Sequence, residues 1–253
     1  MKNFFFQVSI NFKRIIFRNL RFLVFSVLMP IGFYLLFTQV MTQGMSKVVL
    51  QTWNIDYLIS MIIYSTLISS IFTVSNTLLD DHLRKFDLFI ALSPISKTQY
   101  YLSMLVVFLS LNFLSAISLV VVAVAINHIV INLTFLLILC LIAPLLSLPL
   151  FLLGIIVSLT GTGNVVNLLS NILVFPMAIF SGLWWPLTSM PTWMQKIGIL
   201  LPTYHSAQLL KELVNRHYFH LGSFGVLLLW GIFLVALLKG ISTLRDKNEV
   251  QTI

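Results

Sequence analysis

Long apolar stretches constrain this chain more than any other feature of its sequence. A helix that crosses about 30 Å of hydrocarbon needs roughly 20 apolar residues, and six stretches are close to that length or longer. They run from Phe22 to Gln39, Tyr57 to Leu79, Tyr100 to Ile126, Ile131 to Leu159, Val165 to Leu183 and Leu221 to Leu238. Membrane-spanning strands would alternate apolar and polar residues instead. The stretches therefore predict an all-α integral membrane protein: one domain over 1–253, with a six-helix membrane core over 22–243 and a tail over 244–253.

The basic residues predict how this core is oriented. Hydrophobic residues make up 59% of the chain and charged residues only 9%, so most charges must lie in loops. One side holds Lys2, Lys13, Arg14, Arg18, Arg21, Arg84, Lys85, Lys97, Lys239, Arg245 and Lys247, and the other holds Lys47, Lys196, Lys211 and Arg216. Loops rich in Lys and Arg remain on the cytoplasmic side of a membrane. The first, more basic side is therefore predicted to be cytoplasmic, which gives a plasma-membrane protein with both termini in the cytoplasm. The net charge of +8 then favours contact with anionic lipid headgroups over nucleic-acid binding.

The first 21 residues form an amphipathic pattern. At 100° per residue, the polar positions Asn3, Gln7, Asn11, Arg14, Arg18 and Arg21 fall in one stripe, opposite a face of Phe, Val and Ile. Such a helix can lie in the membrane interface, with its Arg side chains at phosphates and its apolar face in the acyl region. The pattern predicts an interfacial helix over 1–21. A frayed basic leader is the alternative, although it would not sort its polar residues by angle.

Catalytic chemistry has little support in the sequence. No phosphate-binding loop of the Gly-x-x-x-x-Gly-Lys-Ser/Thr type occurs, and the predicted spans carry no Asp, Glu, Lys or Arg in their interiors, which disfavours a proton-driven carrier. Cys140 stands alone, and His217 and His220 make an incomplete metal shell. The chain is therefore predicted not to be an enzyme, with no catalytic residue, no metal site and no cofactor of its own.

The loop between the second and third apolar stretches predicts a short helix over 80–92. Leu79, Leu83, Phe86 and Ile90 recur at spacings of four, three and four, and Pro94 then ends the helical pattern. A charged, aromatic-bearing helix at this place can dock on a soluble partner. The alternative is a solvated connector.

Two polar stripes run along apolar stretches. Ser65, Ser69, Phe72 and Asn76 recur along one face of the second, and Asn164, Asn167 and Asn171 along one face of the fifth. Two readings remain open: interhelical hydrogen bonding, or a cavity that also includes Val174 and Phe175 and suits an amphipathic cargo. On the second reading, the substrate path comprises Ser65, Ser69, Phe72, Asn76, Asn167, Asn171, Val174 and Phe175.

Residues 181–214 are too rich in Pro and Trp to continue as one membrane helix. Trp rings favour membrane interfaces, and irregular backbone at membrane depth must be covered by protein or water. The segment is therefore expected to be partly re-entrant and to act as an extracellular gate. Its candidate residues are Trp184, Trp185, Pro186, Pro191, Trp193 and Pro202.

Taken together, these elements resemble the type-2 ABC exporter permeases, a family that includes drug, antibiotic-resistance and polysaccharide exporters. The resemblance covers the whole chain and rests on the N-terminal helix, six spans, Leu92-Ser93-Pro94-Ile95-Ser96 and the late Trp, Pro and Pro-Thr-Tyr pattern. It implies that two permease copies, identical or related, pair above two separate ATPase subunits, which bind ATP and Mg²⁺. It also implies a coupling helix at 80–92 that uses Asp81, Arg84, Lys85, Phe86, Asp87 and Phe89 to contact the ATPase.

One departure from the family pattern concerns this helix. Asp80-Asp81 stands where the family has one acidic residue, and Arg84-Lys85 replaces a stretch that more often contains Gly. With the short turn over 159–164 as a second contact, the resemblance predicts the membrane subunit of an ATP-driven exporter. Its cargo would be a lipophilic or amphipathic compound, such as a drug, an antibiotic, a lipopeptide or a membrane-active peptide. The alternatives are an ATP-independent secondary carrier or channel, and a membrane scaffold.

Overall fold

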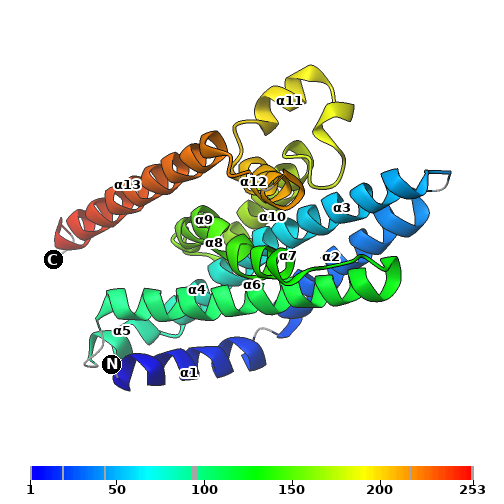
Figure 1. The fold of residues 1–253 in the computed structure, drawn as a ribbon. Coiled ribbons are helices and arrows are strands. Elements are labelled where there is room, and N and C mark those ends of the chain that lie inside the picture. The colour runs from blue at the N-terminus through cyan, green and yellow to red at the C-terminus, as the bar shows by residue number, and fades with distance from the viewer. Residues whose placement is uncertain (1, 19, 43, 93–95, 217, 252–253) are drawn as a thin grey trace.

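The chain folds into helices over the part that the structure describes. This computed structural model describes residues 2–18, 20–42, 44–92, 96–216 and 218–251, and no strand occurs among them. The α-helices are α1 Lys2–Arg18, α2 Leu20–Leu35, α3 Lys47–Ile68, α4 Val74–Leu83, α5 Phe86–Ala91, α6 Lys97–Asn127, α7 Leu133–Leu137, α8 Ala143–Leu146, α9 Leu148–Ser158, α10 Gly163–Phe180, α11 Thr192–Gly198, α12 Pro202–Arg216 and α13 Leu221–Gln251 (Figure 1). Single π-turns are η1 Leu36–Val40, η2 Ser69–Thr73 and η3 Ile138–Ile142, and η4 Leu187–Ser189 is a 3₁₀ turn.

Five helical stretches within the described ranges are long and apolar enough to cross a membrane. They are Lys47–Leu83, Thr98–Asn127, Leu133–Ser158, Gly163–Phe180 and Leu221–Thr243, and a shorter apolar helix covers Val24–Val40. The all-α prediction is confirmed, and each of these helices overlaps one of the apolar stretches.

The second apolar stretch lies at the centre of the fold. In its most apolar window, 94% of the residues of Lys47–Leu83 are buried, against 17% for Leu221–Thr243. Tyr34, Tyr64 and Phe37 are the largest fully buried side chains of the main core, and they come from α2, α3 and η1. α13 therefore lies at the edge of the bundle, where its exposed side chains face the surroundings.

The central stretch is interrupted by η2. A π-turn inserts one residue into a helix and displaces its carbonyl groups, and α9 packs directly on this turn. Gly154 of α9 makes the approach possible, because a Cβ there would lie 2.0 Å from the carbonyl oxygen of Ser70. The missing side chain at this position thus fixes how closely α9 and the central helix pack.

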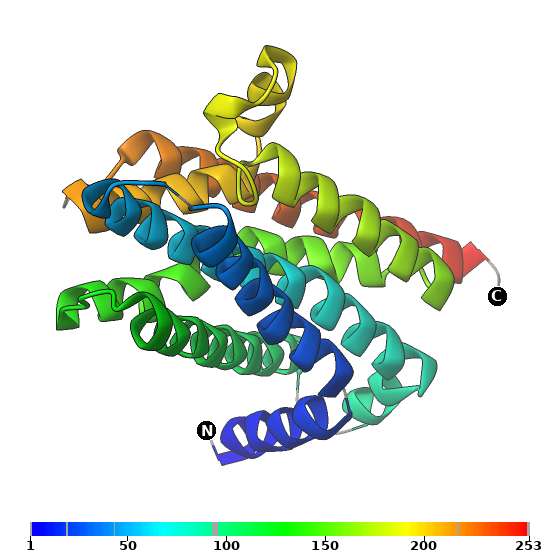
Figure 2. The same ribbon diagram turned by 90° about the vertical axis from the view of Figure 1, so that its right-hand side faces the viewer.

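The two ends of the bundle differ. At one end, α1, α5 and the start of α6 lie together (Figure 1), and we call this the α5 end. Ser96 and Gln99 start α6 there with a capping box, in which each side chain bonds the other residue's backbone N–H. At the opposite end, the segment that carries η4 and α11 projects from the bundle (Figure 2), and we call this the α11 end.

Candidate functional site

A buried ion pair holds α1 against the end of α4 at the α5 end. Arg14 Nη2 donates to Asp81 Oδ2 at 2.7 Å and to Asn11 Oδ1 at 3.1 Å. The Tyr100 hydroxyl, from α6, donates to the same Asp81 oxygen. The Asp81 side chain is only 6% exposed, and a charge removed from water to this extent needs such partners. The pair therefore joins three helices at one carboxylate.

The polar stripe of α1 faces protein. Gln7 and Asn11 are buried, and Asn11 Nδ2 donates to Ser103 Oγ of α6 at 2.7 Å. Ile15 is also buried, whereas Phe5 and Phe6 are each 67% exposed. The expectation that the Arg side chains of this stripe reach lipid phosphates is wrong for Arg14, because Asp81 of α4 and Asn11 of α1 accept its hydrogen bonds. The side chains of Arg18 and Arg21 lie outside those that the structure describes.

The prediction of one helix over 80–92 is wrong, because a left-handed turn at Lys85 separates the end of α4 from α5. The side chains of this segment divide into two groups. Phe86 points inward: the Arg14 guanidinium lies 4.3 Å from its ring centroid, and the Tyr100 ring lies at 6.0 Å. Arg84, Lys85 and Phe89 are exposed, as are Leu83 and Leu92. Asp81 points inward as well, and the side chain of Asp87 is outside the described set. The five described candidates thus split into an inner group, Asp81 and Phe86, and an exposed group, Arg84, Lys85 and Phe89, which is accessible to a partner.

Lys85 has the unusual backbone angle φ 56°. It follows the last turn of α4, where its N–H donates to the carbonyl of His82 at 2.9 Å. Helices often end in this left-handed conformation, and glycine is the residue that adopts it without strain. The departure from a Gly-bearing stretch therefore falls on a position whose geometry glycine would favour.

The stripe on the central helix does not face one space. Ser65 donates to the carbonyl of Ser26 in α2 at 2.7 Å and is bonded to Ser115 of α6. Ser69 is buried, and its hydroxyl has no hydrogen-bond partner among the described residues. Phe72 and Asn76 are half-buried, with Asn76 Nδ2 donating to the Phe72 carbonyl at 2.9 Å. Ser65 thus bonds neighbouring helices, whereas Phe72 and Asn76, further along the chain, reach the surface of the protein.

The helix α10, which carries the second stripe, packs beside the elements that hold Phe72 and Asn76. α10 contacts both η2 and α4, and Ser170 of α10 lies 3.3 Å from Ser75, oxygen to oxygen. Asn167 and Asn171 are exposed, and Asn171 Nδ2 donates to the Asn167 carbonyl at 2.7 Å. The structure therefore places α10 against η2 and α4, the elements that carry Phe72 and Asn76.

Trp184 connects the segment over 181–214 to the core. Its ring stacks on Phe33 at 4.8 Å and meets the edges of Tyr64 and Phe175 at 5.5 and 6.1 Å. Its carbonyl accepts a hydrogen bond of 2.8 Å from the Tyr57 hydroxyl. Val174, the residue before Phe175, is buried. Trp184 and Phe175, predicted as gate and path residues, thus belong to one aromatic cluster.

Residues 182–201, between α10 and α12, fold back on themselves, and we call this stretch the hairpin. Gly182, at φ 75°, reverses the chain after α10. Pro186 and Pro191 precede η4 and α11, and Pro202 begins α12, positions where the lack of an N–H costs little. A Cβ at Gly198 would lie 2.1 Å from the carbonyl oxygen of Phe180, so glycine lets α11 pack on the end of α10.

The exposed side of this hairpin carries two of the predicted gate tryptophans. Trp185 is 43% exposed and Trp193 is 58% exposed. The Trp193 ring meets that of Phe180 edge to face at 6.1 Å. The gate candidates thus divide between Trp184, which faces the core, and Trp185 and Trp193, which face outward.

His205 joins the hairpin to α12 and α13. Its Nε2 lies 2.7 Å from the carbonyl oxygen of Ile199, and its Nδ1 lies 3.1 Å from Ser223 Oγ. The neutral ring satisfies both contacts if Nε2 donates and Nδ1 accepts. Burial lowers the pKa of His205 below its usual 6.5. The hydrogen bond to Ile199 acts in the opposite direction, and the nearby His220 lowers the pKa further.

A polar cavity of about 470 Å³ lies between this hairpin and α12. Asp56, Lys211, Glu212 and Asn215 line its charged side, and Asn215 Nδ2 donates to Asp56 Oδ1 at 3.1 Å. Burial lowers the pKa of Lys211, while the charge of Asp56 raises it. Sequence reasoning missed this cavity, because its walls come from separate segments. No three His, Cys, Asp or Glu side chains in the described ranges converge to hold a metal ion.

Comparison with known proteins identifies the family. The sequence model described as "ABC-2 family transporter protein" matches residues 50–238. The chain is also 29% identical over 209 residues to "Putative transport permease YvfS" of Bacillus subtilis (strain 168), which covers 83% of this chain and 84% of that protein. No solved structure gives a significant match. With its long apolar helices, this chain is a multi-pass membrane protein, and it belongs to the ABC-2 family of transporter proteins.

Proposed function

We propose that this chain is the membrane subunit of an ATP-driven exporter with six transmembrane helices, in which Val24–Val40 belongs to the first. Two copies, or one copy and a related permease, would pair above two ATPase subunits that bind ATP and Mg²⁺. The α5 end would face the cytoplasm, in line with its basic loops. The α11 end would then face outward, and the cargo would be a lipophilic or amphipathic compound.

The observation that carries this proposal is the division of the 80–92 segment. Phe86 and Asp81 anchor it to Arg14 and Tyr100, while Arg84 and Phe89 are exposed. A partner that moves the exposed face would therefore move α1, α4 and α6 together. This arrangement suits a segment that transmits the closing motion of an ATPase to the transmembrane helices.

The path and the gate follow from the same orientation. Asn167 and Asn171 lie on an exposed face of α10 beside Phe72 and Asn76, and a second copy against this face would enclose sparse polar groups within apolar walls. The aromatic cluster around Trp184 would close that space at the α11 end. A secondary carrier or channel remains the alternative function, and it would need no partner at Phe89.

Copurification tests the proposal. The double variant Arg84→Ala/Phe89→Ala should stay in the membrane and lose most of its bound ATPase, because both side chains lie on the exposed face. Lys47→Ala, an exposed charge at the other end of the bundle, is the matched control and should retain the ATPase. Cargo would be sought as compounds that stimulate ATP hydrolysis by the intact complex. Export that persists without any bound ATPase would favour the carrier.

A further inference from the structure

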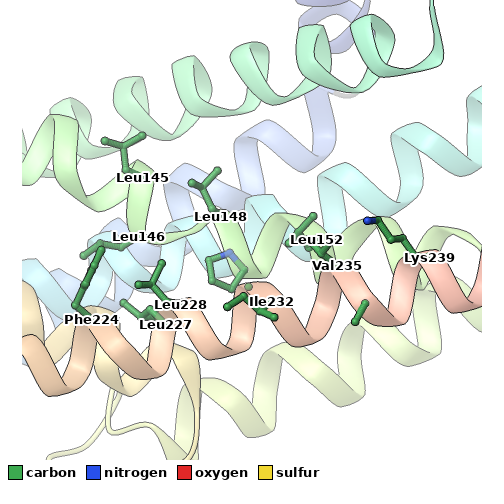
Figure 3. Close-up of a pocket in the computed structure, with 13 residues that line it drawn as sticks. Leu145, Leu146, Leu148, Leu152, Phe224, Leu227, Leu228, Ile232, Val235 and Lys239 are labelled. Atoms are coloured by element: carbon green, nitrogen blue, oxygen red, sulfur yellow. The ribbon is translucent and has the colours of Figure 1, made fainter.

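An apolar groove of about 570 Å³ runs between α8–α9 and the peripheral helix α13 (Figure 3). It is lined by Leu145, Leu146, Leu148, Pro149, Leu152, Phe224, Leu227, Leu228, Gly231, Ile232, Val235, Ala236 and Lys239. Several of these side chains are well exposed, Ile232 at 68% and Leu228 at 52%. The groove lies apart from Trp184, the two polar stripes and the 80–92 segment.

The groove has an apolar body and one charged end. Lys239 is its single ionisable lining residue, and Figure 3 shows it at the end opposite Phe224. Leu238, the residue before it, packs against the cluster that contains Ile15 and Tyr100, so this end of the groove points toward the α5 end. Lys239 therefore lies where a membrane-embedded groove would meet a lipid headgroup.

The dimensions suit a hydrocarbon chain. A rise of 1.5 Å per residue puts Lys239 roughly 22 Å along α13 from Phe224, and the hydrocarbon of one leaflet is roughly 15 Å deep. Gly231 faces the groove at about its middle, and a Cβ there would meet nothing within 4 Å. The missing side chain leaves a notch in the wall of α13 between Leu228 and Val235.

We propose that this groove binds one acyl chain of an anionic phospholipid, with the Lys239 ammonium at the lipid phosphate. The proposal uses the orientation given above, in which the α5 end faces the cytoplasmic leaflet, where anionic lipids attract basic residues. A second protein helix is a poorer occupant, because it would cover Lys239 with apolar surface and leave a charge buried without a partner. An amphiphile instead supplies both chain and counter-charge.

Photo-crosslinking tests the site on the full-length protein in vesicles. The probe is phosphatidylglycerol with a diazirine in its acyl chain, and labelled peptides are mapped by mass spectrometry. Labels should concentrate on residues 145–152 and 224–239. Gly231→Leu fills the notch and should lower this labelling several-fold, because the Leu side chain takes the space that the acyl chain would occupy. Ala236→Leu, a second lining position, should lower it as well.

Gly225→Leu is the matched control. It lies on the same helix, also has open space at its Cβ, and does not line the groove, so its labelling should equal that of the wild type. Lys239→Gln should remove the preference for phosphatidylglycerol over the corresponding phosphatidylcholine probe. The proposal is overturned by equal labelling of the wild type and both filling variants, or by equally strong labels on the exposed face of α6. Loss of dimer in Gly231→Leu would assign the groove to a second copy instead. Labelling needs neither ATPase nor cargo, so a failure of export leaves this test intact.

Discussion

At the scale of single residues, Asp81 illustrates how one buried carboxylate can organise an end of the molecule. It accepts from Arg14 of α1 and Tyr100 of α6, so two helices distant in sequence meet at one oxygen. A buried charge pair adds little net stability against apolar replacement, but removal of one partner leaves the other charge buried alone. The pair should therefore act mainly by fixing position.

Replacing either partner should destabilise the protein more than replacing both. Arg14→Met is expected to cost up to about 3 kcal/mol, at the low end for a broken buried pair because Tyr100 still donates to Asp81. Arg14→Met/Asp81→Leu should recover part of that loss. Thermal unfolding of the purified protein measures it, with Lys13→Met as the exposed neighbouring control. Losses that simply add in the double variant would show that the two residues are not coupled.

Substitutions at Lys85 test whether its left-handed backbone strains the 80–92 segment. Its left-handed backbone costs an L-residue roughly 1 to 2 kcal/mol, so Lys85→Gly should protect amides 80–92 better against hydrogen exchange. Lys85→Val should protect them less, because a β-branched residue tolerates this conformation poorly. Arg84→Gly, at φ −85°, is the control and should bring no gain. If Lys85→Gly weakened protection, the left-handed turn itself would be in question.

At the scale of elements, Gly154 lets α9 pack closely on η2. Gly154→Ala places a Cβ where the Ser70 carbonyl now lies, and overpacking of this kind usually costs about 1 to 3 kcal/mol. Gly32→Ala, in α2 with open space around its Cβ, is the matched control and should cost nothing. Melting temperatures in one detergent compare the two. Equal melting temperatures would mean that α9 can shift away from the turn.

The hairpin that includes α11 should loosen in mild acid. The pKa of His205 lies below its unfolded value of 6.5, so the folded state binds this proton less readily than the unfolded state. Its stabilising contribution is therefore complete above pH 6.5 and is lost as the pH falls toward the lowered pKa. Hydrogen exchange over 198–216, expressed relative to the intrinsic exchange rate at each pH, should rise as the pH is lowered from about 7.5 to about 5.5.

Two histidine variants show whether His205 is responsible. His205→Gln keeps a donor near Ile199 and should remove most of the pH dependence. His128→Gln changes an exposed histidine at another turn and should leave it unchanged. A pH dependence that survives in His205→Gln would point to His220, which lies close enough to affect the pKa of His205.

The pattern of apolar and polar residues predicted where the helices lie, but it did not predict which side chains they contact. The apolar stretches coincide with the long helices, because hydrocarbon thickness fixes their length. Ser65 lies on the predicted stripe, yet it bonds Ser26 and Ser115, since a stripe gives an angle on one helix and says nothing about what packs there. The same limit explains why Arg14 was predicted to face lipid. The Asp80-Asp81 pair was the available signal that a buried cation might lie nearby.

At the scale of the whole molecule, side-chain accessibility reports the orientation. Thr188 is exposed in the projecting hairpin. A cysteine introduced there, in a Cys140→Ala background, should react with a membrane-impermeant thiol reagent added to intact cells. A cysteine at exposed Arg84 should react only after the cells are opened. The reverse pattern would invert the topology and place the 80–92 segment outside.

The polar cavity beside the hairpin shows where sequence reasoning stops at this scale. Asp56 comes from the central helix, and Lys211 comes from α12. Neither position stands out in its own segment, and their proximity depends on how the hairpin folds back through Gly182 and Gly198. Contacts of this kind follow from tertiary packing, which no local pattern encodes.

The ion pair between Arg14 and Asp81 also has a consequence for biosynthesis. The two residues are 67 positions apart in the chain, and ribosomes add roughly 5 to 20 residues per second. Arg14 therefore emerges about 3 to 13 seconds before its partner is made, and Ser103, which bonds Asn11, is made later still. During that interval the first helix cannot reach its final place. Its docking therefore has to wait until residues 81 and 103 have both been made.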